Sequence, residues 1–587
     1  MKKAMKKKLI SVGVASGLMI VIIGCLGVNK LIEHYTPTNE KQDLYTYFEI
    51  QDENEAIISL QNNRLEERAE IVDGEIFVPY ELVKDNFNSR FYWDESASLM
   101  VFTTATEIYK IPLESKNYTV NGEERTEEFI ILKTIEDGLY LNIDFAKQYS
   151  DFYYEYYQEP NRIMVYNEWG NVDYTTLSKD GKIRVLGGIK SPILAELEKG
   201  TRVLVKDLME NWAHVQTIDG IDGYIQLEYL GDSQIVTLEN PDYIEPVYPN
   251  IQKDYKINMA WHQVGGYIGA DGFQQAMQGV SGVNTIAPTW FFMSDNDGNI
   301  VSYATHEYVQ KAHEMGIEVW GLVQNMDYDI SSYQILSRMA SRENLVNQLI
   351  SKALEYDLDG INVDIEELSN DAEDGYIQFI RELSIQCRKH GLVLSIDNYV
   401  PTAFTSHYNR KEQGIVADYI VIMGYDEHYA GVAEAGSTAS IEFVKNGIIK
   451  TLEEVPKEKV INGIPFYTRV FKQIPENVAK EGQEGVLIED TNSELGRYLL
   501  DSEAVPMGKA ERLLQENGVN PIWNDALGQY YGEYMKDGIK YLIWLEEEES
   551  IGLKMKLIKD YELAGVAEWS LGLAKNTIWE VIRSYLE

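Results

Sequence analysis

A run of acidic and amide side chains at residues 359–366 is the part of the sequence best suited to chemistry. It reads Asp359-Gly-Ile-Asn362-Val-Asp364-Ile-Glu366. In a β-strand, side chains two residues apart share one face, so Asn362, Asp364 and Glu366 align while the apolar residues face the other way. Buried carboxyls are costly unless they serve a site. Burial and close negative neighbours raise a carboxyl pKa, so we expect Glu366 to hold a proton and act as a general acid. A calcium-binding acidic loop is the alternative, which the apolar alternation disfavours.

The elements that must position this run form an α/β pattern from about residue 252 to 587. Short apolar strands are expected at 257–261, 285–288, 318–323, 360–365, 393–396, 419–423, 460–464 and 565–568, with amphipathic helices between them at 306–315, 342–356 and 374–390. Eight strands alternating with helices fit one (β/α)8 TIM barrel better than an open sheet. The long gap from about 466 to 564 predicts an inserted strand-rich subdomain between the seventh and eighth strands. Residues 359–366 then end the fourth strand, where such barrels build active sites.

Several segments of this barrel, in the right order, resemble glycoside hydrolase family 18, the chitinase-like barrels. They are the signature Asp359-Gly-x-Asn362-x-Asp364-x-Glu366, the motif Met423-Gly-Tyr425-Asp426, the stretch from Asn462 to Arg469, and Glu568-Trp569. Trp261 and Pro288-Thr289-Trp290-Phe291 are similar to the spore-germination, cortex-lytic branch of that family. Together these segments span most of residues 252–587.

The resemblance implies a role for each matching residue in a retaining, substrate-assisted glycosidase. Glu366 would be the general acid and base, Asp364 would orient the substrate acetamido group, and Tyr425 would hydrogen-bond to it. The substrate contacts would come from Asn362, Asp426, Trp569, Met423, Trp290 and Arg469, while Asp359 would be structural. Most chitinases have Asp where this chain has Asn362. Because Asn cannot share a proton, Asp364 is expected to ionise more readily than in a carboxylate pair.

The implied activity is hydrolysis of β-1,4 bonds in N-acetylglucosamine-containing cell-wall glycan, with peptidoglycan as the expected substrate. A chitinase acting on chitin oligomers is one alternative, and a non-catalytic glycan-binding protein is another. The presence of Asp364, Glu366 and Tyr425 together favours an enzyme. No cofactor or metal is implied, and a monomer is expected.

The N-terminus carries a location signal. Lys2, Lys3, Lys6, Lys7 and Lys8 precede an uncharged run over residues 9–28. That run is about long enough to cross a membrane, and its basic flank keeps the N-terminal end in the cytoplasm. Residues 1–35 are therefore expected to be a single-pass anchor with an extracellular catalytic domain. A lipoprotein signal ending at Cys25 and a cleaved signal peptide are the alternatives.

Two small β-rich domains are expected between this segment and the barrel, after a polar stalk over residues 36 to about 50. Residues 50–175 contain a weak repeat, with Asp73-Gly74 and Asp137-Gly138 each opening one copy. They resemble the domain named after the N-terminus of copper amine oxidases, without any His cluster for copper. Residues 180–235, with short strands and Asp-Gly turns, resemble a bacterial Src-homology-3-like (SH3-like) barrel, which implies attachment to the cell wall.

Composition bounds the partners. The formal net charge of −42 excludes nucleic acid, because a phosphate backbone would be repelled. The two cysteines, Cys25 and Cys387, lie in the leader and in an expected helix, so no disulfide framework is predicted.

Overall fold

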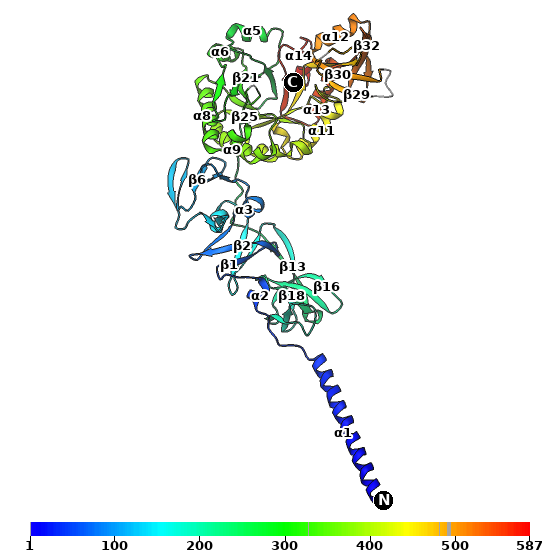
Figure 1. Cartoon of the computed structure of the whole chain (residues 1–587). Helices are drawn as coiled ribbons and strands as arrows, with labels where there is room; N and C mark the ends of the chain where they lie inside the picture. The colour runs from blue at the N-terminus through cyan, green and yellow to red at the C-terminus, as the bar shows by residue number, and fades with distance from the viewer. Residues whose placement is uncertain (1, 327, 481, 490–494, 587) are drawn as a thin grey trace. The chain divides into compact units, whose positions relative to one another are not determined.

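The computed structural model describes residues 2–326, 328–480, 482–489 and 495–586. The chain forms two compact units (Figure 1). The first contains residues 1–91, 112–117 and 126–245, and the second contains residues 92–111, 118–125 and 246–587.

A closed barrel of eight parallel strands forms the centre of the second unit. The strands are β20 (Ile257–His262), β21 (Thr285–Met293), β23 (Glu318–Gln324), β24 (Gly360–Asp364), β25 (Val393–Tyr399), β26 (Tyr419–Met423), β27 (Val460–Pro465) and β34 (Gly565–Trp569). Pairing of β20 with both β21 and β34 closes the barrel, and β22 (Ile300–Ser302) adds an antiparallel strand beside β21. The eight strands expected from the apolar runs are confirmed.

Helices surround these strands (Figure 1). They are α5 (Ala270–Ala276), α6 (His306–Glu314), α7 (Ser332–Ser337), α8 (Met339–Glu355), α9 (Glu373–His390), α10 (Arg410–Val416), α11 (Ile441–Leu452), α13 (Glu548–Asp560) and α14 (Ile578–Leu586). Helix α9 shows the usual end signals. Its first turn is acidic, and it stops at Gly391, whose φ of 71° is easiest for glycine.

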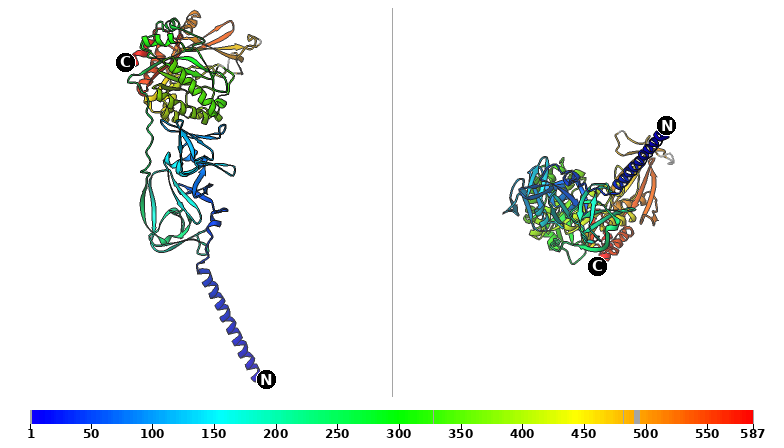
Figure 2. Two further views of the ribbon diagram at one scale, coloured as in Figure 1. Left: turned by 90° about the vertical axis from the view of Figure 1, so that its left-hand side faces the viewer. Right: turned by 90° about the horizontal axis from the view of Figure 1, so that it is seen from below.

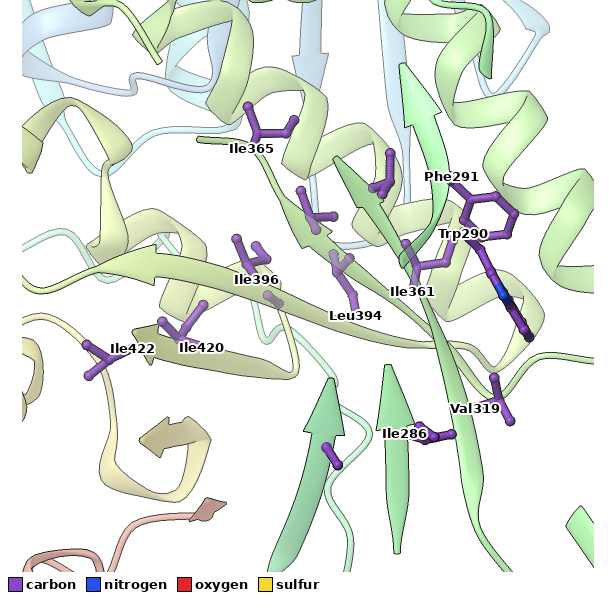
Figure 3. Packing of buried hydrophobic residues seen from close by; sticks show 14 of the residues in the cluster. Ile286, Trp290, Phe291, Val319, Ile361, Ile365, Leu394, Ile396, Ile420 and Ile422 are labelled. Atoms are coloured by element: carbon purple, nitrogen blue, oxygen red, sulfur yellow. The ribbon is translucent and has the colours of Figure 1, made fainter. Parts of the chain in front are cut away.

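Period-two alternation in the strands divides the barrel core into two layers. The inner layer includes Trp320, Leu322 and Val421, which fill the barrel. The outer layer lies between the strands and the helices and contains Val363. It also contains Ile361 and Ile365 (Figure 3). Residues 362 and 364 therefore face inward, as the alternation in the sequence predicts.

An inserted subdomain lies between the seventh and eighth barrel strands, as the long gap predicts. Its sheet has the order β29-β30-β28-β33-β32-β31. The strands are β28 (Tyr467–Pro475), β29 (Val486–Glu489), β30 (Arg497–Pro506), β31 (Ile522–Asn524), β32 (Gln529–Lys536) and β33 (Ile539–Leu545), and α12 (Met507–Glu516) packs on them. Strand β28 follows β27 almost directly, so the subdomain starts at the rim of the barrel.

A small sheet from far upstream in the chain packs against the barrel helices within the second unit. Its strands are β4 (Phe91–Asp94), β5 (Leu99–Thr103), β6 (Ile108–Pro112), β7 (Asn117–Val120) and β8 (Glu123–Thr126). Arg342 of α8 pairs with Asp94 at 3.2 Å and with Glu382 of α9 at 3.4 Å, and all three side chains are buried. The Arg342 guanidinium also lies over the ring of Tyr92, whose hydroxyl donates to the carbonyl of Ser337.

The first unit contains two seven-stranded sheets. One, in the order β11-β12-β1-β2-β3-β10-β9, comprises β1 (Glu55–Leu60), β2 (Asn63–Val72), β3 (Glu75–Pro79), β9 (Leu132–Ile135), β10 (Gly138–Asn142), β11 (Tyr153–Tyr157) and β12 (Arg162–Tyr166). The other, in the order β15-β14-β18-β17-β16-β13-β19, comprises β13 (Gly170–Leu177), β14 (Gly181–Arg184), β15 (Ile193–Leu197), β16 (Arg202–Leu208), β17 (Trp212–Thr217), β18 (Asp222–Gln226) and β19 (Leu230–Leu238). Short helices α3 (Tyr80–Asn86) and α4 (Ile143–Gln148) follow β3 and β10, which pair with each other. The two domain resemblances and their boundaries stay predictions.

The segment expected to be a stalk is paired to the second of these sheets. Gln42 donates its backbone N–H to the carbonyl of Ile193, and Ile193 donates to the carbonyl of Glu40. Thr38 bonds in the same way to Ile189. Helix α2 (Leu44–Phe48) follows, and Phe48 is buried in the apolar core of that sheet. Residues 38–48 are thus a folded part of the first unit.

Helix α1 (Lys2–Tyr35) is one continuous helix (Figure 2). Its Gly13–Tyr35 part has a mean hydropathy of 1.9 and is exposed, and among the described residues it is the one helix long and apolar enough to cross a membrane.

Candidate active site

Six of the predicted site residues meet in one pocket at the carboxyl ends of the barrel strands. The pocket has a volume of about 150 Å³ and is lined by Trp261, Asp364, Glu366, Asp397, Tyr399, Met423, Tyr425, Asp426 and Trp569. These residues come from β20, β24, β25, β26 and β34 or the loops that follow them. The parallel barrel brings their ends to one rim, where side chains from different strands can act on one substrate.

Glu366 lies two residues beyond the end of β24 and is fixed by two neighbours. The side chain of Asn325 accepts the backbone N–H of Glu366 at 3.0 Å and donates to its carbonyl at 2.8 Å. Tyr399 donates its hydroxyl to Oε2 of Glu366 at 2.6 Å. Burial raises the pKa of Glu366 and the Tyr399 hydrogen bond partly lowers it. The result is a partly buried carboxyl biased towards its protonated form and aimed into the pocket.

Asp364 lies deeper than Glu366 and is buried. Burial, and then the negative charges of Asp397 and Glu366, raise its pKa well above the usual range. Among the described residues, its Oδ1 atom has no hydrogen-bond partner. A buried acceptor without a donor is costly in a finished fold, and a substrate N–H would satisfy it.

Asn362 forms the floor beneath the two carboxyls and has no exposed surface. Its amide nitrogen donates to Oδ1 of Asp397 at 2.8 Å and to the hydroxyl of Ser395 at 2.9 Å. Its oxygen accepts the indole N–H of Trp261 at 3.1 Å. Because an indole nitrogen can only donate, the amide orientation is fixed.

Aromatic rings form the apolar side of the pocket. Trp261 contacts Tyr425 and Trp569 edge to face, with ring centres 6.4 and 5.7 Å apart. Burial raises the pKa of Tyr425 well above its usual range, so its hydroxyl remains a hydrogen-bond donor. Indole and phenol faces pack well on the C–H surfaces of a sugar ring.

Asp426 is held at the rim by the inserted subdomain. Tyr467 donates its hydroxyl to Oδ1 of Asp426 at 2.6 Å, and Arg469 lies 3.5 Å from the same oxygen. Both residues belong to β28. The backbone φ of Asp426 is 59°, a conformation that Asp adopts more easily than most residues.

Four of the predicted residues lie outside the pocket lining, and one of them is Arg469, which reaches Asp426 from β28. Trp290 is fully buried in the outer core layer and contacts Tyr308, since a bulge between Thr289 and Phe291 interrupts the alternation of β21. Asp359 lies at the opposite end of β24, where it accepts the backbone N–H of Val319. Asn362 lies beneath the pocket and hydrogen-bonds to two of its lining residues, Asp397 and Trp261.

Asp397 and Tyr399 are site residues that the sequence reasoning missed. Both belong to β25, where Ser395, Asp397 and Tyr399 alternate with apolar residues. That is the same period-two signal that picked out residues 362–366. Applied to β25, it would have marked both residues as facing inward. Among the described residues, no group of three or more His, Cys, Asp or Glu side chains is arranged to hold a metal ion.

Comparison with known proteins gives concordant matches. The family described as "Glycosyl hydrolases family 18" matches residues 263–574, more than half of the 587 residues. The uncharacterized glycosylase YvbX of Bacillus subtilis (strain 168) is 25% identical over 316 residues, covering 51% of this chain and 84% of that protein. The cortical fragment-lytic enzyme of the same organism is 21% identical over 341 residues, covering 56% and 74%. The crystal structure of the C-terminal domain of a chitinase-like protein from Desulfitobacterium hafniense DCB-2 aligns with a TM-score of 0.50 at 20% identity, over 57% of this chain and 100% of that one.

Proposed function

The chain belongs to glycosyl hydrolase family 18 and is a glycoside hydrolase, and we propose that its substrate is the glycan of the cell wall. The bonds cleaved are β-1,4 bonds of N-acetylglucosamine-containing glycan, and Glu366 is the general acid and base. The observation that carries the proposal is the meeting of Asp364, Glu366 and Tyr425 in one pocket beside the Trp261 and Trp569 rings. Peptidoglycan is the proposed substrate, and the cortical fragment-lytic relative supports it.

The proposed mechanism uses the substrate as its own nucleophile. Glu366 protonates the glycosidic oxygen while the carbonyl oxygen of the neighbouring acetamido group attacks the anomeric carbon. The glycosidic C–O bond breaks and a cyclic oxazolinium ion forms. Asp364 accepts the acetamido N–H and stabilises the positive charge, and Tyr425 donates to the acetamido oxygen. Glu366 then removes a proton from water as the water opens the ring, so the anomeric configuration is retained.

Three features of the pocket fit these roles. The raised pKa of Glu366 favours the protonated acid before the first step. The Oδ1 atom of Asp364 has no hydrogen-bond partner among the described residues, so it can accept an N–H of the substrate. Asp426 and Trp569 bound the pocket where a sugar ring would lie. A carboxylate nucleophile is unnecessary in this scheme.

We further propose that helix α1 keeps the enzyme in the cell membrane with residues 36 onward outside. The length and hydropathy of its Gly13–Tyr35 part support an anchor. A lipoprotein linked through Cys25 and a protein secreted after cleavage are the other arrangements.

Digestion of purified peptidoglycan beside chitin oligomers, with product masses read out, tests the activity. Glu366→Gln should lower the release of reducing sugar by about 10²- to 10⁴-fold, while glycan binding persists. The control is Glu367→Gln, the same change in an exposed neighbour, which should retain activity. Equal turnover by Glu366→Gln and wild type would refute the assignment, and binding without turnover by wild type would favour a binding protein. Cleavage of chitin oligomers alone would favour a chitinase.

The stereochemistry gives an independent test of the mechanism. Proton magnetic resonance of the earliest product should show the β anomer, as retention requires. An initial α anomer would exclude the oxazolinium route.

A further inference from the structure

Asn362 and Asp397 form a fixed pair beneath the catalytic carboxyls. The amide of Asn362 uses both of its N–H groups, one towards Asp397 and the other towards Ser395, and its oxygen is occupied by Trp261. It carries no titratable proton. Asn362 can therefore support the site but cannot hold a proton for Asp364.

Asp397 is placed to do so from the neighbouring strand. Strands β24 and β25 are parallel, with Asn362 opposite Ser395 and Val363 opposite Ile396. One step further along this register sets Asp364 beside Asp397, on the inward face and across strands about 4.8 Å apart. Both side chains line the pocket and both are buried. The charge of Asp397 also raises the pKa of Asp364, so the two carboxyls are close enough to interact.

We infer that Asp397 is a positioning residue for the reaction: its carboxyl, in the protonated form, donates a hydrogen bond to Asp364 and holds that carboxylate as an acceptor facing the substrate acetamido group. Two adjacent buried carboxyls cannot both be ionised at low cost, so the pair retains one proton between them. Asn362 bonds to the other side of Asp397 and orients it. The inference deepens the proposed function, and its tests by enzyme kinetics rest on that function.

Both carboxyls have a raised pKa. Burial, together with the charges of Asp397 and Glu366, holds the pKa of Asp364 well above its usual range, so the pair keeps a proton at neutral pH. Burial raises the pKa of Asp397 to about 8, although the hydrogen bond from Asn362 lowers it. Glu366 interacts with both carboxyls of the pair. The other titratable groups that interact with the pair or with Glu366 are Asp426, Glu367, Tyr376, Tyr399, Tyr408 and Tyr425. The three carboxyls add negative charge and the tyrosines stay neutral, so these groups favour keeping the proton on the pair. The proton is present at neutral pH and is lost as pH rises through about 8.

The matched variants are Asp397→Asn and Asp397→Leu. An Asn at 397 can accept from Asn362 and donate to Asp364 at every pH, like a permanently protonated Asp. We expect it to keep kcat at pH 7 within a few-fold of wild type. Between pH 7 and 9, wild type should lose about tenfold more activity than Asp397→Asn. Leu has a similar size but no hydrogen-bonding group, so kcat should fall about 10²-fold.

Ser395→Ala is the control, because it removes the other hydrogen bond of Asn362 without touching either carboxyl. Its activity should follow the same pH profile as wild type. The inference is overturned if Asp397→Asn is as inactive as Asp397→Leu, or if it keeps the wild-type loss of activity between pH 7 and 9. The first result would mean that the charge of Asp397 is required, and the second that its proton has no role.

A readout without catalysis separates this inference from the proposed function. Infrared difference spectra of the protonated-carboxyl band, recorded from pH 6 to 10, should show one proton leaving wild type near pH 8 that is missing from Asp397→Asn. If wild type cleaves no glycan, the proposed function fails and the infrared titration still decides whether Asp397 holds the proton. If that proton is absent, the inference fails whatever the activity.

Discussion

At the scale of single residues, the protonation of Glu366 depends on two opposed contributions. Burial favours the neutral acid, and the hydrogen bond donated by Tyr399 favours the anion. A general acid must be protonated in the first step and ionised in the second, so neither contribution should dominate. In the proposed mechanism, Tyr399 therefore adjusts the protonation of Glu366.

Tyr399→Phe tests this role. Removing the hydrogen bond should raise the pKa of Glu366 and move the alkaline limb of kcat/KM upward by about one pH unit. We also expect kcat to fall about tenfold, because the carboxyl loses its fixed orientation. Tyr333→Phe, in an exposed position of α7, is the control. A profile that moves to lower pH would contradict the role given to Tyr399.

Glu568 presents a different case, since it is buried and neither of its carboxyl oxygens has a hydrogen-bond partner among the described residues. Burial alone raises its pKa well above the usual range. The unfolded chain ionises this group near pH 4.5, whereas the folded chain keeps it protonated. Stability must therefore fall as pH rises above that value.

Glu568→Gln, which cannot ionise, should remove this dependence. Relative to wild type, its free energy of unfolding should rise by about 1.4 kcal/mol per pH unit above pH 5, up to the folded pKa of Glu568. Urea denaturation of both proteins between pH 5 and 8 measures the difference. Parallel stability curves would show that Glu568 is ionised in the fold.

The sequence predicts contacts within one strand better than contacts between two strands. Asp364 and Glu366 are two residues apart on one strand, so alternation alone places them together. The contact of Asp397 with Asn362 spans two strands and depends on register, which alternation does not fix. The hydrogen bond from Tyr399 to Glu366 also joins residues of two neighbouring strands, so it too depends on register.

At the scale of elements, the sequence predicts the positions of the strands but not the polar contacts between elements that lie far apart in the chain. Apolar runs are local, and for that reason all eight barrel strands could be located from the sequence. The buried contact of Arg342 with Asp94 joins residues 248 positions apart. In the sequence, Asp94 follows an aromatic patch and resembles any residue at a turn. Nothing local indicates that it will neutralise a buried arginine of the barrel layer.

Asp94→Ala should consequently destabilise the second unit. Removing one partner of a buried ion pair leaves the other charge poorly compensated, at a cost of about 3 kcal/mol. Glu382 remains 3.4 Å from Arg342 and limits the loss. The control is Glu442→Ala, whose exposed pair with Lys445 at 4.0 Å should change stability by less than about 0.5 kcal/mol. Equal effects of the two changes, in urea denaturation, would mean that the β4–β8 sheet contributes little to the barrel.

At the scale of the whole molecule, the proposed membrane anchor can be tested through helix α1. For an uncleaved anchor, Cys25→Ser should leave the full-length chain in the membrane fraction, resistant to alkaline extraction, because the apolar helix holds it there. Intact mass of the membrane-bound protein should include residues 1–24. Loss of the variant from membranes, or a mature chain beginning at Cys25, would establish the lipoprotein arrangement instead.

The pairing of residues 38–42 with Ile189 and Ile193 leaves a short connection between helix α1 and the first unit. Helix α1 ends at Tyr35, and backbone pairing resumes at Thr38. The two residues between them, Thr36 and Pro37, span at most about 7 Å, whereas a free coil from residue 36 to 50 would span several times that length. In an anchored enzyme, so short a connection would keep the first unit from moving far from the membrane. The glycan that such an enzyme can cut would then be limited to what lies near the membrane.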